Sequence, residues 1–216
     1  MLFIDIQTAK QKEMERFLPE VSAPSNYKDG KKISEYIQKR TQEMRAGMAL
    51  DPDYGRIIAI GYAQSEKDRP VVMPYCDNDE FDNKYPTEAD MLTTFWDLFA
   101  KHSGHICGYN VFGFDLPYIM RRTLANRIKI HAPVPELKKY QTRPVCDLMG
   151  IMYNWNLSDS KPLKTVAEIY GLDYNLPPEL DLSNIDVMPA ELVEQVCYNN
   201  VNVSQQLFRR MQGLYF

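Results

Sequence analysis

Short apolar runs of strand length alternate along this chain with longer segments whose apolar residues recur at helical spacing. The strand-like runs are residues 2–6, 56–63, 71–75, 105–110 and 145–149. Helices are predicted at residues 31–46, from Thr87 through Phe99, at 114–127, at 163–170, and from near Pro189 to about Met211. Three early strands followed by alternating helices and strands are typical of a mixed α/β protein. The order therefore predicts an α/β fold with a five-stranded mixed sheet flanked by helices.

Several residues mark where these elements begin or end. Thr87 is a typical N-cap, and Gly171 stands just after a predicted helix, where glycine is favoured. Pro189 suits the first turn of the last helix. Residues 51–55 (Asp-Pro-Asp-Tyr-Gly) predict a turn, and Pro74 favours the edge or the end of a strand. These signals support the division of the chain into strands and helices.

Length and composition indicate an ordinary globular protein. The 216 residues, 44% of them apolar, suit one domain that spans residues 1–216. No stretch approaches the roughly 20 apolar residues that cross a bilayer. The first residues lack a basic region and soon meet an acid, so they predict a core strand and not a signal peptide. The cysteines form no CxxC pair, and each is predicted to be a small buried residue of a reducing, cytoplasmic protein: Cys76, Cys107, Cys146 and Cys197.

The net charge of −4 argues against a protein that coats nucleic acid through broad electrostatic attraction. A local track of positive charge is compatible with that value, because phosphate binding depends on where the basic residues lie. Three clusters are candidates for such a track, although each also suits a solvated surface: Lys28, Lys31, Lys32, Lys39 and Arg40; Arg121, Arg122, Arg127 and Lys129; and Lys138, Lys139 and Arg143.

Acids and amides occur at three places where the surrounding pattern predicts core. Asp5 lies within the first strand, and the alternation of side chains along a strand puts Gln7 on the same face. Asp115 follows the run that ends at Asn110, and Asn199-Asn200 interrupt the apolar stripe of the last helix. A buried carboxylate is costly unless it is paired, so a shared hard cation is one explanation. The other is that Asp5 is a solvated strand end and Asp115 an N-cap.

The same three places resemble the motifs of a nuclease family. Residues 4–8 (Ile-Asp-Ile-Gln-Thr) resemble the first motif, Asp-x-Glu-Thr, with Gln7 in place of glutamate, and residues 110–115 match the second, Asn-x3-Phe-Asp, in full. Residues 196–201 stand where the third, Tyr-x3-Asp-Val, is expected, with Val196 for tyrosine and Asn200 for aspartate. The chain is thus similar to DEDD (DnaQ-like) 3′–5′ exonucleases, above all to predicted 3′–5′ exonucleases related to the exonuclease domain of family B DNA polymerases.

This resemblance implies a ribonuclease-H-like fold and a set of site residues. The catalytic positions are Asp5, Gln7, Asp115, Asn200 and Val196; the residues that contact the substrate are Thr8, Asn110 and Phe114; the remaining metal ligands are Asp5 and Asp115. A second register, which pairs Tyr198 with Asn202, keeps the tyrosine but turns the polar position away from the apolar stripe. Asn200 is therefore the preferred equivalent of the last aspartate.

The substitutions imply a damaged metal centre. In the enzymes that the chain resembles, four carboxylates hold two divalent metal ions about 4 Å apart. Two amides in place of two acids lower the formal charge of the ligands from −4 to −2, which predicts a single Mg²⁺ or Mn²⁺ ion, weakly held. The general base is also missing, because Val196 and Gln195 occupy its two known positions and the three histidines lie elsewhere in the chain. Such a loss typically lowers the rate by about two to four orders of magnitude.

Three functions remain compatible with this sequence. The first is a binder of a single-stranded 3′ end, DNA or RNA, with little or no hydrolysis, in which Phe112 and Phe114 either stack on bases or pack within their loop. Shape-preserving replacements such as Gln7 and Asn200 favour this function. The second is a weak manganese-dependent nuclease that uses Asp5 and Asp115. The third is a structural or interaction module that no longer binds nucleic acid. None of the three involves a membrane.

Overall fold

The computed structural model describes residues 1–73, 86–177, 180, 185 and 188–216. Within them, five strands form one mixed sheet in the order β3-β2-β1-β4-β5, as the sequence predicts. The strands are β1 (Leu2–Lys10), β2 (Gly55–Ala63), β3 (Val71–Val72), β4 (Ile106–Gly108) and β5 (Val145–Asp147). The meander β1-β2-β3 is antiparallel, whereas β1, β4 and β5 run parallel to one another. The central strand β1 therefore lies where the two halves of the sheet meet.

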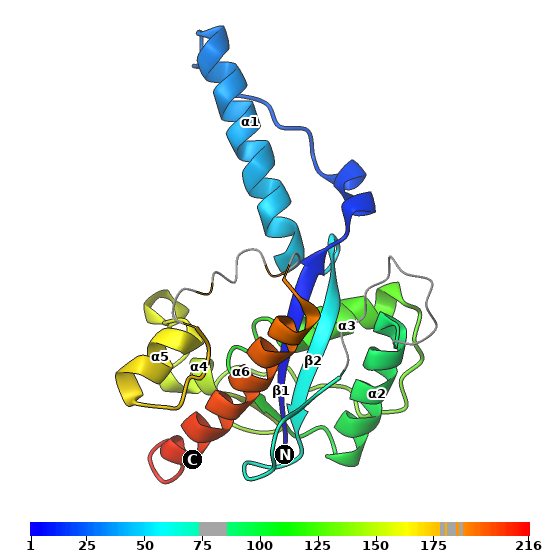
Figure 1. Ribbon diagram of the computed structural model, residues 1–216, viewed down its shortest axis with the longest axis vertical. Coiled ribbons are helices and arrows are strands. Elements are labelled where there is room, and N and C mark those ends of the chain that lie inside the picture. Colours follow the sequence, from blue (N-terminus) through cyan, green and yellow to red (C-terminus); the bar gives the residue numbers. More distant parts are fainter. Residues whose placement is uncertain (74–85, 178–179, 181–184, 186–187) are drawn as a thin grey trace.

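Helices cover both faces of this sheet (Figure 1). The helices are α1 (Gly30–Gly47), α2 (Glu88–Lys101), α3 (Asp115–Ala125), α4 (Leu148–Met152), α5 (Leu163–Tyr170) and α6 (Ala190–Met211); the short 3-10 turns are η1 (Lys12–Phe17), η2 (Met48–Leu50) and η3 (Leu157–Asp159). All five predicted helices are confirmed. The predicted run 145–149 is only partly a strand, because the Asp147 side chain accepts the Gly150 N–H at 2.9 Å and starts α4.

The predicted boundary residues act largely as expected. Thr87 caps α2 and forms a reciprocal capping box with Asp90. Gly171 ends α5 at φ 57°, a left-handed conformation that glycine adopts without strain. Pro189 lies one residue before α6, with an extended ψ of 143°, and not within its first turn. The predicted strand at 71–75 is confirmed for Val71–Val72, and residues 74 and 75 lie outside the described residues.

Alternation along β1 divides the core between the two faces of the sheet. Leu2, Ile4 and Ile6 join the cluster beneath α2 and α3, whereas Phe3 joins the cluster that contains residues of α5 and α6. Asp5 has the same parity as Phe3 and so faces α6. The three described cysteines, Cys107, Cys146 and Cys197, are free and buried as predicted; Cys76 lies outside the described residues. None of the described helices combines the length and apolar character needed to span a membrane.

Residues 11–50, named the arm here, connect β1 to β2 and extend away from the sheet (Figure 1). The arm runs through η1 and an irregular segment, returns along α1, and ends in η2. No residue of α1 is buried, which confirms the exposed helix that the sequence predicts. Both chain termini lie at the opposite end of the molecule from the tip of the arm (Figure 1).

Candidate functional site

A cleft of ≈ 390 Å³ opens beside the carboxyl ends of β1 and β4. The two strands pair only at Leu2–Ile106 and Phe3–Cys107, so the later residues of β1 have no partner on that side within the pairing. Crevices outside the carboxyl ends of parallel strands are common ligand sites in α/β proteins. The cleft is lined by Asp5, Ile6, Gln7, Thr8, Ala46, Ala49, Leu50, Tyr109, Asn110, Phe114, Asp115 and Ile185.

Asp5 is the centre of a hydrogen-bonded group in this cleft. Gln7 Nε2 donates to one carboxylate oxygen at 2.6 Å, and Asn200 Nδ2 donates to the other at 3.3 Å. The two amides singled out in the sequence, Gln7 and Asn200, therefore both contact Asp5, although Asn200 comes from α6, 195 residues along the chain. Burial raises the pKa of Asp5 to about 7, against the opposing effect of these hydrogen bonds.

Asp115 supplies the second carboxylate from the first residue of α3. Its Oδ1 accepts the backbone N–H of Ile6 at 3.0 Å, which fixes the start of α3 against β1 beyond the end of β4. The side chain is buried, and burial together with the negative charge of Asp5 raises the pKa of Asp115 well above its usual value. Both acids thus share one cleft and oppose each other's ionisation.

These raised pKa values predict how stability depends on pH when no metal is present. An acid whose pKa rises on folding binds more protons in the folded state, so its contribution to the free energy of unfolding falls as pH increases. For Asp5 the fall lies between its ordinary pKa of 3.8 and about 7. Asp5→Asn should therefore gain stability relative to the parent protein as pH rises through this window, as measured by urea unfolding in EDTA. Asp97→Asn, which removes an exposed carboxylate from α2, is the control; equal slopes for all three proteins would contradict the prediction.

The structure also brings the expected substrate-contacting residues to this cleft. Thr8, Asn110 and Phe114 all line it. The pairing of β1 with β2 shifts register between Gln7 and Thr8, because β2 has one extra residue there. Such a bulge changes the direction of the strands at this point. Asn110 adopts φ 66°, a left-handed conformation that asparagine tolerates better than most residues. The centroid of the Phe114 ring lies 5.4 Å from that of the Tyr118 ring, which supports it. Phe114 also lines the cleft.

None of the third-motif positions is among the described residues that line the cleft. Val196 is fully buried in the apolar cluster between α6 and the sheet, where it contacts no cleft space. Tyr198 and Asn202, the other possible register, line a different cavity beside β3, and the guanidinium of Arg69 lies over the Tyr198 ring. Of the two asparagines, it is Asn200 that reaches Asp5.

Asp147 is a further acid near this end of the sheet, but its carboxylate is already occupied. It accepts the backbone N–H groups of Asn110, Phe112 and Gly150 at 3.2, 2.9 and 2.9 Å. These bonds hold the loop after β4 against the start of α4. Asp147 is therefore a structural residue that shapes one side of the cleft and does not line it.

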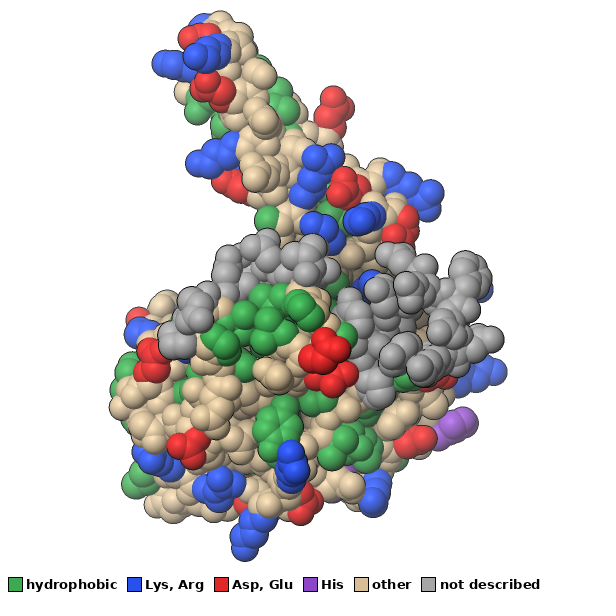
Figure 2. Space-filling model, viewed as in Figure 1, with side chains coloured by type: hydrophobic (Ala, Val, Ile, Leu, Met, Phe, Trp, Pro, Cys, Tyr) green, Lys and Arg blue, Asp and Glu red, His purple; other side chains and the backbone are tan. Residues whose placement is uncertain are grey.

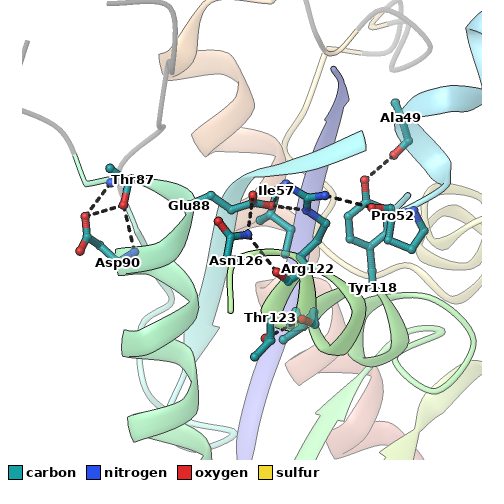
Figure 3. A network of polar contacts seen from close by, with 11 residues as sticks. Ala49, Pro52, Ile57, Thr87, Glu88, Asp90, Tyr118, Arg122, Thr123 and Asn126 are labelled. Atoms are coloured by element: carbon teal, nitrogen blue, oxygen red, sulfur yellow. Dashed lines mark hydrogen bonds and ion pairs between the residues drawn. The ribbon is translucent and has the colours of Figure 1, made fainter. Parts of the chain in front are cut away.

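A buried ion pair between Glu88 and Arg122 joins α2 to α3 (Figure 3). Glu88 of α2 accepts two hydrogen bonds from Arg122 of α3, at 2.9 and 2.8 Å, and one from the Ile57 N–H of β2 at 2.8 Å. Arg122 also donates to the carbonyl of Pro52 at 3.1 Å, which anchors the turn before β2. Nearby, the Tyr118 hydroxyl donates to the carbonyl of Ala49 at 3.1 Å. The network thereby locks α3, which begins with Asp115, to the base of the arm.

Sequence reasoning missed several lining residues. Tyr109 directly precedes the second motif, and its position next to Asn110 was the signal that could have found it. Ala46, Ala49 and Leu50 come from the base of the arm, where nothing in the sequence indicates proximity to a site. Cys197 was missed as well; its thiol donates to the backbone carbonyl of Asp5 at 3.3 Å.

The chemistry of the site is that of oxygen ligands. Two carboxylates and two amide oxygens are the donor types that Mg²⁺ and Mn²⁺ prefer. Among the described residues, no three His, Cys, Asp or Glu side chains gather closely enough to hold a metal ion. A cation would have to use Asp5 and Asp115 and turn the Gln7 and Asn200 amides so that their oxygens face it. The residues therefore fit a hard cation in kind but offer it little negative charge.

Comparison with known structures shows the fold. The family B DNA polymerase from the hyperthermophilic archaeon Pyrobaculum calidifontis is similar with a TM-score of 0.56 at 18% sequence identity, over 97% of this chain and 24% of the polymerase chain. The chain thus spans about a quarter of the length of that polymerase. The mixed five-stranded sheet with flanking helices is the ribonuclease-H-like arrangement expected from the sequence. No curated protein matches the chain.

Comparison with protein families gives a match to residues 50–192, about two thirds of the chain. The family is described as "Predicted 3'-5' exonuclease related to the exonuclease domain of PolB". The matched segment contains Asn110 and Asp115, whereas Asp5, Gln7 and Asn200 lie outside it and are brought to Asp115 by the fold. The chain belongs to this family of predicted 3′–5′ exonucleases related to the exonuclease domain of PolB.

Proposed function

We propose that this chain binds the 3′ end of a single-stranded nucleic acid in the cleft beside β1 and β4 and hydrolyses it weakly or not at all. The observation that carries the proposal is the pair of hydrogen bonds from Gln7 and Asn200 to the two oxygens of Asp5. Under this proposal, Gln7 and Asn200 stand in place of two acids of an exonuclease site, keep its shape and donate hydrogen bonds to its central carboxylate without adding negative charge. The site thus favours retention of a strand end over its cleavage.

A metal ion in this cleft would be a single Mg²⁺ or Mn²⁺ ion. Asp5 and Asp115 would hold it weakly. Such an ion polarises a phosphoryl oxygen when it is bound. The chain's own residues oppose its entry, because both oxygens of Asp5 already accept hydrogen bonds and burial raises the pKa of both acids. Val196 offers no base, because its side chain is a hydrocarbon, and it lies in the core. We place the protein in the cytoplasm, where its buried thiols stay reduced.

Phe114 provides the surface on which the terminal base stacks. It lines the cleft together with Asp5, Asp115 and Asn110, so a strand whose last phosphate approaches the acids has its base beside this ring. Base–aromatic stacking contributes about 1–3 kcal/mol per base in proteins that bind single strands. Phe112, two residues earlier, packs 5.5 Å from the Trp155 ring and does not line the cleft.

This difference gives a matched test. A 5′-labelled single-stranded DNA or RNA oligonucleotide is incubated with the protein and Mg²⁺ or Mn²⁺, and both its binding and its length are followed. We expect binding with unchanged length, and a loss of affinity of about 5- to 150-fold in Phe114→Ala. Phe112→Ala is the control and should bind as the parent does. Progressive shortening by the parent protein would show an active nuclease, and equal affinities of all three proteins would show that the cleft does not bind the strand.

A further inference from the structure

The arm presents a basic, aromatic surface that leads away from the cleft. Helix α1 contains five lysines and arginines against two glutamates, a net charge of +3, in a chain whose net charge is −4. The rest of the chain therefore carries −7. Lys and Arg side chains lie along the arm and at its tip (Figure 2). Positive charge is thus concentrated on α1, which alone among the described α-helices has no buried residues.

Part of this charge is not neutralised within the arm. Lys31 pairs with Glu35 at 3.9 Å, while Glu43 is shared by Lys39 at 3.9 Å and Arg40 at 2.5 Å. Arg45 pairs with Glu15 at 3.0 Å. Within the part of the chain that the structure describes, no acid lies within ion-pair distance of Lys32. Exposed pairs of this kind contribute little, so phosphate can compete for the basic partners.

A groove of ≈ 590 Å³ runs along the side of α1 that carries Lys32, Lys39 and Arg40. It is lined by Tyr27, Lys32, Glu35, Tyr36, Lys39, Arg40 and Glu43. The rings of Tyr27 and Tyr36 lie 5.4 Å apart and are nearly perpendicular, at 70°. Basic side chains interleaved with aromatic rings are the combination that holds single strands without regard to sequence, through backbone charge and base stacking.

The arm is continuous with the cleft. Ala46, Ala49 and Leu50, at its base, form part of the cleft wall. At a rise of about 1.5 Å per residue, Arg40 lies about 9 Å and Lys32 about 21 Å along the helix from Ala46. Among the described residues that line the cleft there are two carboxylates and no lysine or arginine. A polyanion that enters this cleft must therefore find its counter-charge next to it, and the arm supplies it.

We propose that the groove along α1 binds the phosphate backbone of the single strand, upstream of the 3′ end that the cleft holds. The proposal rests on the proposed function and adds a second contact region, which makes affinity depend on strand length. A fully stacked strand advances about 3.4 Å per nucleotide, so a span of about 21 Å takes roughly six nucleotides at most. A trinucleotide reaches only the cleft, whereas a dodecanucleotide covers both regions.

The test compares these two lengths in the full chain. 5′-Labelled oligothymidylates of 3 and 12 nucleotides, with a phosphorothioate as the last linkage, are titrated with protein at several salt concentrations. The triple variant Lys32→Glu, Lys39→Glu, Arg40→Glu should lose about tenfold or more in affinity for the 12-mer and bind the 3-mer as the parent does. The slope of log affinity against log salt should become shallower by about 2, since each lost phosphate contact accounts for about 0.7.

The control variant makes the same change in net charge elsewhere, by Lys129→Glu, Lys138→Glu and Lys139→Glu in an exposed loop. Equal losses in the two triple variants, or unchanged 12-mer affinity in the arm variant, would overturn the proposal. The proposal would also be overturned if the parent protein is a dimer and the arm variant is a monomer, because the groove would then bind a second copy of the chain. Failure of the proposed function has another signature: Phe114→Ala leaves binding unchanged while the arm variant still weakens it.

Discussion

Gln7→Glu combined with Asn200→Asp is expected to give the chain measurable 3′–5′ exonuclease activity. The change removes both amide donors from Asp5 and places two negative charges beside it. A charge about 4 Å from a cation is worth on the order of 4 kcal/mol at an effective dielectric near 20, before desolvation is counted. We therefore expect affinity for Mg²⁺ or Mn²⁺ to rise roughly 100-fold or more. The shortening of a 5′-labelled oligonucleotide measures the activity.

Two further measurements separate the causes. Without metal, four acids in one cleft repel one another, so the double variant should melt at a lower temperature than the parent and recover when Mn²⁺ is added. Its rate should still lie about two to four orders of magnitude below that of an enzyme with a general base, because the hydrocarbon side chain of Val196 cannot accept a proton. Adding Asp115→Asn to the variant is the control and should abolish the gain. A variant that Mn²⁺ does not stabilise would show that the cleft is no metal site.

Arg122→Met is expected to lower the free energy of unfolding by about 3–5 kcal/mol, because it leaves Glu88 as an uncompensated buried charge. The two side chains are only 9% and 5% exposed, and Arg122 makes two of the four hydrogen bonds that Glu88 accepts. For a chain of this size, the melting temperature should fall by roughly 6–20 °C. Urea unfolding and thermal melting measure the two quantities.

The neighbouring residue provides the matched control. Arg121 also pairs with acids, Asp51 and Asp53, but its side chain is 47% exposed. Arg121→Met should therefore cost less than about 1 kcal/mol. In the double variant Glu88→Leu, Arg122→Met, the loss should be smaller than the sum of the single losses, since neither partner is left alone. Equal costs for Arg121→Met and Arg122→Met would show that burial does not decide the strength of the pair.

Local patterns predicted most elements because strand alternation, helical spacing and caps depend on residues that are close in sequence. Thr87 and Gly171 end their helices as expected, and Asp5 and Gln7 share one face of β1. The prediction was wrong where a side chain overrides the pattern. Asp147 lies in an apolar run that suggests a longer strand, yet its carboxylate caps a helix and ends the strand there.

Only those residues of the candidate site that belong to the sequence motifs were predictable. The motif residues named Asp5, Gln7, Asp115 and Asn200, and the structure places all four around one cleft or in contact with it. The roles within the group were not predictable. That both amides donate to Asp5 depends on rotamers and on the approach of α6 to β1, which no spacing between motifs encodes.

By itself, the sequence determined the order of strands and helices, the family and the identity of the motif residues, because each rests on neighbours in the chain or on a recognisable motif. Only the tertiary structure decided that Val196 is core, that Asp147 is a cap, and that the base of the arm forms a wall of the cleft. These facts depend on contacts between distant residues, such as Ile6 with Asp115, 109 positions apart. The packing of helices on both faces of the sheet sets such contacts, and it is fixed by the whole core and not by any one segment.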